Sequence, residues 1–143
     1  LNAEKFLIVD GKKAFRTGDL GFYKNGLLFI RGRNDDQIKY NGYRIELGEI
    51  NTAISKVDFV DNVVTIPIKK GSEVKRIISV MLLNEKFTDE SSFLSEIMFN
   101  NLDGKIPPYM IPNDYKVVKI FPVNKSHKID KLKLAEMYKK GEL

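Results

Sequence analysis

The sequence contains no cysteine and only one histidine among its 143 residues. Without cysteine the chain can form no disulfide, and it offers no thiolate for catalysis or for metal binding. One histidine with no cysteine leaves no cluster of the nitrogen and sulfur ligands that transition metals prefer. The composition therefore excludes a fold stapled by disulfides and argues against a transition-metal centre.

Long hydrophobic runs are also missing. No stretch approaches the roughly 20 apolar residues of a membrane-spanning helix, and 43% hydrophobic with 30% charged residues is typical of a globular chain. The opening LNAEKFLIVDGKKAF lacks the basic, apolar and small-residue order of a signal peptide. We expect a soluble, cytoplasmic chain of one domain, or one domain and a fragment. Because it begins at Leu1 rather than Met, we interpret it as a piece of something longer.

The charge balance is mildly basic, with 24 Lys and Arg against 19 Asp and Glu, a net charge of +5. The lysines of the second half are interleaved with acids and aliphatic runs, which indicates a solvated surface. No stripe alternates arginine with aromatics, and lysine far outnumbers arginine, the residue that reads guanine and stacks on bases. This pattern argues against nucleic-acid binding, but a basic surface would suit an acidic protein partner.

The first 45 residues predict three consecutive β-hairpins. Each candidate turn is Asp-Gly or Asn-Gly, because both central residues of a tight hairpin turn take a positive φ. The predicted pairs are residues 5–9 with 14–16 around Asp10-Gly11, 22–24 with 27–31 around Asn25-Gly26, and 38–40 with 43–45 around Asn41-Gly42.

The remaining sequence mixes helices and strands. Leu47, Ile50, Ile54 and Val57 keep helical spacing and predict an amphipathic helix of about three turns. Further along, the sequence predicts a hairpin of 62–69 with 74–83, a helix over 93–102, a strand over 115–123, a polar loop over 124–127 and a helix over 131–140. Without regular βαβ alternation, this order predicts an α+β fold, a small mixed sheet with flanking helices plus β-hairpins.

Three segments together carry a resemblance to a known family. FRTGDLGFYKNGLLFIRGRNDDQIKYNGYRIELGEI resembles the run at the junction between the large and small domains of the adenylate-forming enzymes. These are the acyl- and aryl-CoA synthetases, firefly luciferase and the amino-acid-activating domains of peptide synthetases. IPPYMIP and FPVNKSHKIDKLKL are similar to the closing segments of that family. Within it, NGYRIELGEI and PPYMIP look most like the amino-acid activators, and the compact length resembles D-alanine:D-alanyl carrier protein ligase.

The resemblance implies a two-step reaction. A carboxylate attacks the α-phosphate of ATP to give an acyl-adenylate and pyrophosphate, and a phosphopantetheine thiol then takes the acyl group. The small domain, or lid, rotates between the steps. By this resemblance residues 1–34 are the tail of the large domain, residues 35–143 are the lid, and Asp35 is the hinge. ATP and Mg²⁺ would be bound mainly by the missing large domain, and the partners would be that domain and an acidic carrier protein.

Two residues match nucleotide contacts of the family. Asp19, in RTGD, matches the carboxylate that accepts hydrogen bonds from the ribose hydroxyls, and its two oxygens suit a vicinal diol. Arg33 matches an arginine that contacts the nucleotide, and its fixed donors suit hydroxyls or phosphate. The alternatives are a turn-capping aspartate and a surface ion pair of Arg33 with Asp35 or Asp36.

Lys128 matches the lysine that bridges the carboxylate substrate and the α-phosphate in this family. A mobile ammonium directed at the developing charge is what adenylation requires, because positioning and electrostatics supply most of the catalysis. The alternative is a solvated surface lysine. His127 stands where the family normally has glycine, and histidine adopts the left-handed region only at some cost. His127 could also be an acid or base, but without a defined partner it is better interpreted as a loop residue.

Gly42 matches the glycine over which the pantetheine arm passes during thioester formation; the alternative is a simple tight turn. The Ser/Thr/Gly-rich phosphate loop of the full enzyme is absent, and so is an acyl pocket, so we do not expect this chain to catalyse the reaction alone. The sequence leaves three functions open: the lid of a ligase that loads a carrier protein, the lid of an acyl-CoA synthetase, and a non-catalytic interaction module.

Overall fold

The computed structural model describes residues 6–33 and 36–143, apart from the side chains of Leu20 and residues 31–33. The chain divides into two compact units, Leu1–Gln37 and Ile38–Leu143. We describe each unit by itself. The domain boundary predicted after Asn34 stays a prediction.

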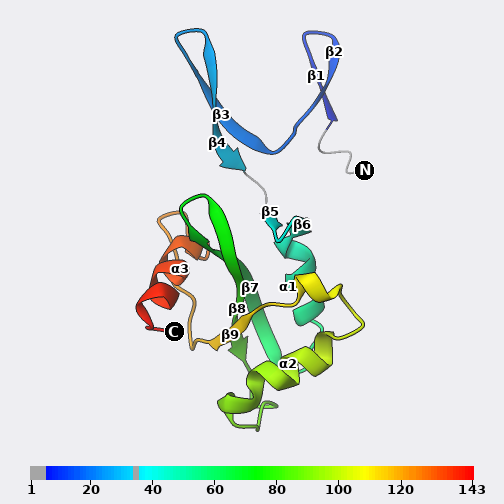
Figure 1. Cartoon of the computed structure of the whole chain (residues 1–143), viewed down its shortest axis with the longest axis vertical. Coiled ribbons are helices and arrows are strands. Elements are labelled where there is room, and N and C mark those ends of the chain that lie inside the picture. Colours follow the sequence, from blue (N-terminus) through cyan, green and yellow to red (C-terminus); the bar gives the residue numbers. More distant parts are fainter. Residues whose placement is uncertain (1–5, 34–35) are drawn as a thin grey trace. The chain divides into compact units, whose positions relative to one another are not determined.

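Unit 1 consists of two β-hairpins (Figure 1). The first pairs β1 (Phe6–Val9) with β2 (Lys12–Phe15), and the second pairs β3 (Asp19–Lys24) with β4 (Leu27–Arg33). Both turns have the positive φ values that the sequence predicts: Asp10 49°, Gly11 75°, Asn25 53° and Gly26 75°.

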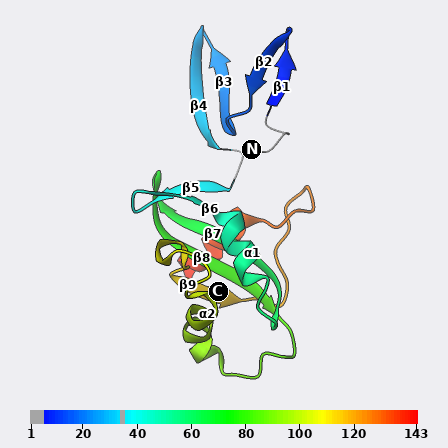
Figure 2. The same ribbon diagram turned by 90° about the vertical axis from the view of Figure 1, so that its right-hand side faces the viewer.

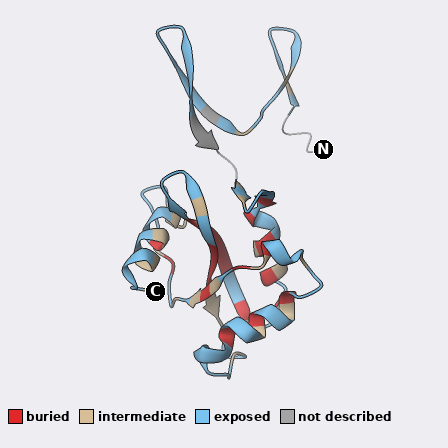
Figure 3. Ribbon diagram, viewed as in Figure 1, coloured by how far each residue is buried: buried red, intermediate tan, exposed pale blue. Residues whose placement is uncertain are grey.

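Unit 1 has no core of its own among its described residues, because none of them is buried (Figure 3). Phe6 lies against Phe15, and Phe22 stacks on Phe29, in each case with ring centroids 5.2 Å apart. All four rings remain more than 40% exposed. Two-stranded hairpins are marginally stable by themselves, and these rings leave apolar surface that the two hairpins do not cover themselves.

Unit 2 is built on a three-stranded mixed sheet. The strands are β7 (Val60–Lys70), β8 (Glu73–Leu83) and β9 (Asp114–Val117), with β8 in the centre, antiparallel to β7 and parallel to β9. Before the sheet come the hairpin of β5 (Gln37–Tyr40) and β6 (Tyr43–Glu46) and the helix α1 (Leu47–Ile54). The remaining elements are η2 (Ser91–Phe93), α2 (Leu94–Leu102), η3 (Pro108–Met110) and α3 (Lys131–Lys140).

Both faces of this sheet are apolar, because side chains alternate along a strand. Val63, Ile77 and Met81 face one core cluster, which α1 and α2 complete with Leu47, Ile50, Ile54, Leu94, Met98 and Leu102. Ile66, Ile78 and Val80 belong to a second cluster, which α3 covers with Leu134. Figures 1 and 2 show α1 and α3 on opposite sides of the sheet. The predicted α+β fold is confirmed.

Polar groups within this architecture are mostly paired. Thr65 and Ser79 are 0% exposed, and their hydroxyls form a hydrogen bond of 2.7 Å across β7 and β8. On the outer edge of β7 the Thr65 N–H donates to the Asn51 side chain of α1, at 2.8 Å. This contact covers part of an edge strand that would otherwise present free backbone groups.

Two predicted elements are too long. The helix ends at Ile54 rather than after about three turns; the Ser55 hydroxyl donates to the Thr52 carbonyl, and Val57 reaches the core from the following turn. The predicted strand 115–123 ends at Val117, because its partner β8 ends soon after and Pro122 has no N–H to donate. Val123 instead forms an isolated antiparallel bridge with Ile129.

One buried hydroxyl tests this description of the core. The Tyr115 hydroxyl has no hydrogen-bond partner in the described part of the chain, and burial raises the pKa of Tyr115 well above its ordinary value. In the folded state the phenol therefore stays protonated above a pH of about 10, where unfolded tyrosine ionises. Ionisation of the unfolded state lowers the wild-type free energy of unfolding as pH rises.

We expect Tyr115→Phe to leave the free energy of unfolding at pH 7 within about 1 kcal/mol of wild type or to raise it. Above a pH of about 10 the variant should gain on wild type, as urea unfolding at several pH values would show. The matched control is Tyr138→Phe, since the Tyr138 hydroxyl donates to Asp114 at 3.0 Å and accepts from Arg76 at 3.1 Å. A larger loss for Tyr115→Phe than for Tyr138→Phe would contradict an unpaired hydroxyl.

Candidate functional site

The predicted catalytic lysine lies on a short closed loop, residues 124–128, which we call the lysine loop. The Asn124 N–H donates to the Lys128 carbonyl at 2.8 Å, and the His127 N–H donates to the Asn124 carbonyl at 3.0 Å. The bridge between Val123 and Ile129 closes the base of the loop. These contacts join the first residue of the loop to the last and so restrain the backbone of Lys128.

Asn124 organises this loop, a role that our sequence analysis missed. Its side-chain oxygen accepts from the Ser126 N–H at 2.9 Å and from the Lys128 N–H at 3.2 Å. Asparagine commonly bonds the backbone two residues further on, and such a turn could have been expected from the polar run NKS. The side chain thus fixes the backbone of Lys128 directly.

His127 adopts a left-handed backbone with φ of 58°. This is the conformation that glycine adopts without strain, and for other residues it costs roughly 1–2 kcal/mol. The imidazole is exposed, and no hydrogen bond of it is found among residues 6–33 and 36–143. The loop therefore adopts the left-handed conformation at this position although the residue is histidine rather than glycine, at the cost of some backbone strain.

The lysine loop is anchored to unit 2 on the α3 side of the sheet. Phe121, before the loop, is 8% exposed and belongs to the second core cluster, against which Ile129 packs after the loop. Asp130 then caps α3 by accepting from the Lys133 N–H at 3.0 Å. The Lys128 side chain is exposed, and within the described residues its ammonium has no hydrogen bond or ion pair. The backbone of the lysine loop is therefore anchored to the core, while the exposed Lys128 ammonium is accessible to a ligand.

Unit 1 brings the two predicted nucleotide residues together. Asp19 and Arg33 are directly opposite each other in the register of β3 and β4. Gly18, with φ of 87°, turns the chain into β3, and the Asp19 N–H donates to the Thr17 hydroxyl at 3.2 Å. The Arg33 side chain and the whole of Asp35 lie outside the described residues, so neither predicted role is tested.

Gly42 lies at the tip of the β5–β6 hairpin. Asn41 and Gly42 have φ values of 48° and 82°, which confirms the predicted tight turn. A Cβ at Gly42 would meet no described atom within 4 Å, so the space above the turn is open. The hairpin is anchored by Ile45, which is 1% exposed, in the core cluster on the α1 and α2 side of the sheet.

Lys128 and Gly42 are thus carried by one unit but are anchored to clusters on opposite faces of its sheet. The structure does not bring them into one site. Among the described residues there is no group of three or more His, Asp or Glu side chains that could hold a metal ion. Nor does any helix there have the length and apolar character needed to cross a membrane.

No protein-family model matches the chain, but curated proteins and solved structures are similar to it. It is 36% identical over 134 residues, 94% of its length, to a D-alanine--D-alanyl carrier protein ligase of Bacillus cytotoxicus, and equally so to that of Bacillus anthracis. The chain is thus similar over nearly its whole length to a part of these ligases. It spans 27% of the length of these curated relatives.

Several solved structures have the same fold as this chain. A Mycobacterium tuberculosis fatty acyl CoA synthetase matches with a TM-score of 0.63 and 25% identity, over 93% of this chain and 26% of that one. An amide bond synthetase from Marinactinospora thermotolerans matches with a TM-score of 0.65 and 17% identity, over 92% and 26%. The ATP-bound RpMatB-BxBclM chimera B1 gives a TM-score of 0.67 at 24% identity, over 92% and 26%.

The strain at His127 gives a direct test of the lysine loop. Replacing a left-handed residue by glycine removes steric strain, so His127→Gly should raise the free energy of unfolding by about 1 kcal/mol. Lys125→Gly, in the same loop but without a positive φ, should lower it by up to about 1 kcal/mol. Urea unfolding of both variants would measure the difference. Shifts of the same sign would contradict the left-handed assignment.

Proposed function

We propose that this chain is the mobile C-terminal domain of an ATP-dependent ligase. The enzyme would activate the carboxylate of an amino acid as an acyl-adenylate. It would then transfer the acyl group to the phosphopantetheine thiol of a carrier protein. The observation that carries the proposal is the similarity of 94% of the chain to the carrier-protein ligases. A cytoplasmic location, and ATP and Mg²⁺ bound mainly by the large domain, belong to the same proposal.

The exposed apolar side chains of unit 1 support the idea of a missing large domain. Phenylalanines at 6, 15, 22 and 29 are all more than 40% exposed, although burying such a ring is worth roughly 1.5–3 kcal/mol. A large domain that continues the hairpins of unit 1 would cover these rings. The opposed positions of Asp19 and Arg33 then fit the edge of a nucleotide site, with the Asp19 carboxylate accepting from the ribose hydroxyls.

In the first half-reaction a substrate carboxylate oxygen bonds to the α-phosphorus of ATP, and pyrophosphate leaves. Negative charge grows on the oxygens of the reacting groups, and the Lys128 ammonium would stabilise it. A loop held by Asn124 limits the positions that the Lys128 backbone can adopt, so the cation is largely pre-oriented. The Lys128 side chain itself keeps the freedom to swing onto the substrates.

In the second half-reaction the thiol would approach along the Asn41-Gly42 turn. The lysine loop and this turn are anchored to opposite faces of one sheet, which suits their presentation to one active site in turn rather than together. Rotation of unit 2 between the half-reactions would achieve this. We place the pivot at Asp35, next to the point after Gln37 where the compact units divide.

The basic charge of the chain also suits this proposal. Its net charge of +5 would steer an acidic carrier protein toward it. A second candidate is the lid of an acyl-CoA synthetase, which the fold shared with a fatty acyl CoA synthetase favours. Acyl transfer to a phosphopantetheinylated carrier protein, assayed beside transfer to free CoA, separates the two. Absence of ATP–pyrophosphate exchange in the full-length protein, with amino acids and with fatty and aryl acids alike, would leave only a non-catalytic module.

Lys128 provides the sharpest test in the full-length enzyme. We expect Lys128→Ala to lower ATP–pyrophosphate exchange by on the order of 100-fold or more, because a positioned cation is lost from the transition state. Transfer from a supplied acyl-adenylate should stay within about twofold of wild type. Lys125→Ala, an exposed lysine of the same loop, is the matched control and should affect neither. Equal loss in both half-reactions would refute the adenylation role.

A further inference from the structure

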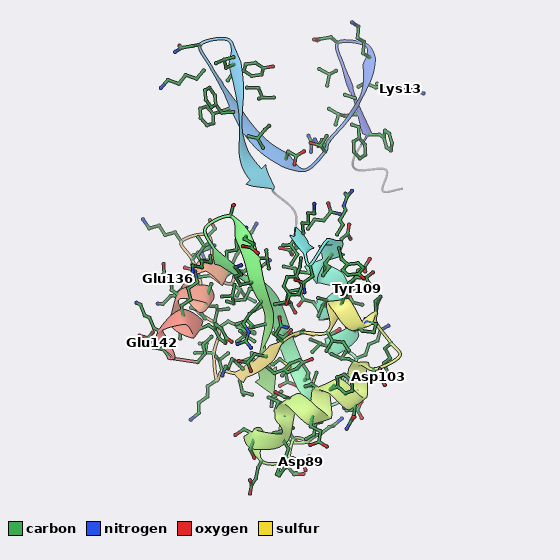
Figure 4. All side chains as sticks on the ribbon, viewed as in Figure 1. Lys13, Asp89, Asp103, Tyr109, Glu136 and Glu142 are labelled. Carbon is green, nitrogen blue, oxygen red and sulfur yellow. The ribbon has the colours of Figure 1, made fainter. Side chains whose placement is uncertain are left out.

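The two residues that flank the Asn41-Gly42 turn are both held by the same distant segment, residues 107–113, which we call the clamp segment. The rings of Tyr43 and Tyr109 stack with centroids 3.9 Å apart and planes 4° from parallel. Figure 4 labels Tyr109 on this segment. The Tyr40 hydroxyl donates to the Asn113 side-chain oxygen at 3.2 Å. The clamp segment therefore contacts the residue before the turn and the residue after it.

The clamp segment is itself fixed to the central strand. The Asn113 N–H donates to the Ile77 carbonyl of β8 at 2.7 Å, and the Asn113 side-chain oxygen accepts from the Ile77 N–H at 2.7 Å. Met110, next to Tyr109, is 4% exposed and lies in the core cluster on the α1 and α2 side. Prolines at 107, 108 and 112 restrict the backbone further. The tyrosine stacking and the Tyr40–Asn113 hydrogen bond thus connect the turn, through the clamp segment, to the sheet.

Burial alone does not account for the tyrosine pair. Tyr43 and Tyr109 remain 49% and 36% exposed, whereas the base of the hairpin is already secured by Ile45 in the core. A hairpin of two strands is marginal on its own, so its tip would move without a second support. The stacked rings supply that support at the end of the hairpin where the turn lies.

We propose that Tyr109 is a positioning residue for thiol transfer. By stacking on Tyr43, with Asn113 holding Tyr40 on the other side, Tyr109 keeps the Asn41-Gly42 turn at a fixed height along the path of the thiol. The inference rests on the proposed function, since it assigns to the clamp segment a part in the second half-reaction only. The lysine loop is anchored in the other core cluster, through Phe121 and Ile129.

The test in the full-length enzyme compares Tyr109→Ala with Tyr109→Phe. An aromatic pair is worth about 1 kcal/mol, within a range that corresponds to roughly two- to twelvefold in a rate or binding constant, so Tyr109→Ala should lower kcat/KM for the phosphopantetheinylated carrier protein by roughly fivefold. ATP–pyrophosphate exchange should stay within about twofold of wild type. Tyr109→Phe keeps the ring and should restore transfer. Tyr109 is preferred to Tyr43 for mutation, because Tyr43 adjoins the turn itself.

A second readout uses the 143-residue chain and needs no activity. The ¹⁵N heteronuclear NOE of Gly42 should fall in Tyr109→Ala and return in Tyr109→Phe, while the NOEs of β7 and β8 and the urea midpoint stay unchanged.

Unchanged transfer in an active Tyr109→Ala enzyme, or equal loss of both half-reactions with a lowered urea midpoint, would overturn the positioning role. A wild-type enzyme without ATP–pyrophosphate exchange would overturn the proposed function and the transfer role with it; the Gly42 NOE then still decides whether the clamp is mechanical.

Discussion

The central hairpin β7–β8 carries apolar side chains on both of its faces, and residues 38–143 are arranged to cover them. Val63 and Met81 face one way while Ile66 and Val80 face the other. A sheet of this kind must be packed on both sides to remove its apolar surface from water. Helices α1 and α2 cover one face and α3 covers the other. This requirement places the loops that join these elements to the sheet.

The functional loops inherit their positions from this packing. The β5–β6 hairpin leads into α1 and is rooted in one core cluster through Ile45. The lysine loop leads into α3 and is rooted in the other through Phe121. Two chemically different loops are therefore carried on one compact unit and are rooted on opposite faces of its sheet. Under the proposed function, this separation would be the reason for the domain to turn between the two half-reactions.

Much of the fold could be predicted from local sequence. The Asp-Gly and Asn-Gly turns were predicted because few residue pairs tolerate two successive positive φ values, and the structure confirms them at Asn25-Gly26 and Asn41-Gly42. The helices predicted over residues 93–102 and 131–140 correspond to α2 and α3. The strand ending at Val117 was predicted too long, since its length depends on where β8 ends and local propensity does not contain that information.

The site was less accessible to local reasoning. Lys128 is an exposed lysine like many others, and only the resemblance to a family singled it out. The opposition of Asp19 and Arg33 depends on strand register, including a bulge between Leu20 and Gly21. The stacking of Tyr43 on Tyr109 joins residues far apart in the sequence. No periodicity predicts such a contact, which exists only once α1, α2 and the sheet have packed.

Double electron–electron resonance, which measures the distance between two spin labels, tests directly whether unit 2 takes two orientations. The chain has no cysteine, so Asp103→Cys, at the exposed end of α2, would give it a single spin-label site, with a second label on the large domain of the full-length enzyme. The account predicts one distance with ATP and the carboxylate substrate, and a separate distance with an acyl-adenylate analogue and the phosphopantetheinylated carrier protein. The same distance distribution in both states would contradict it.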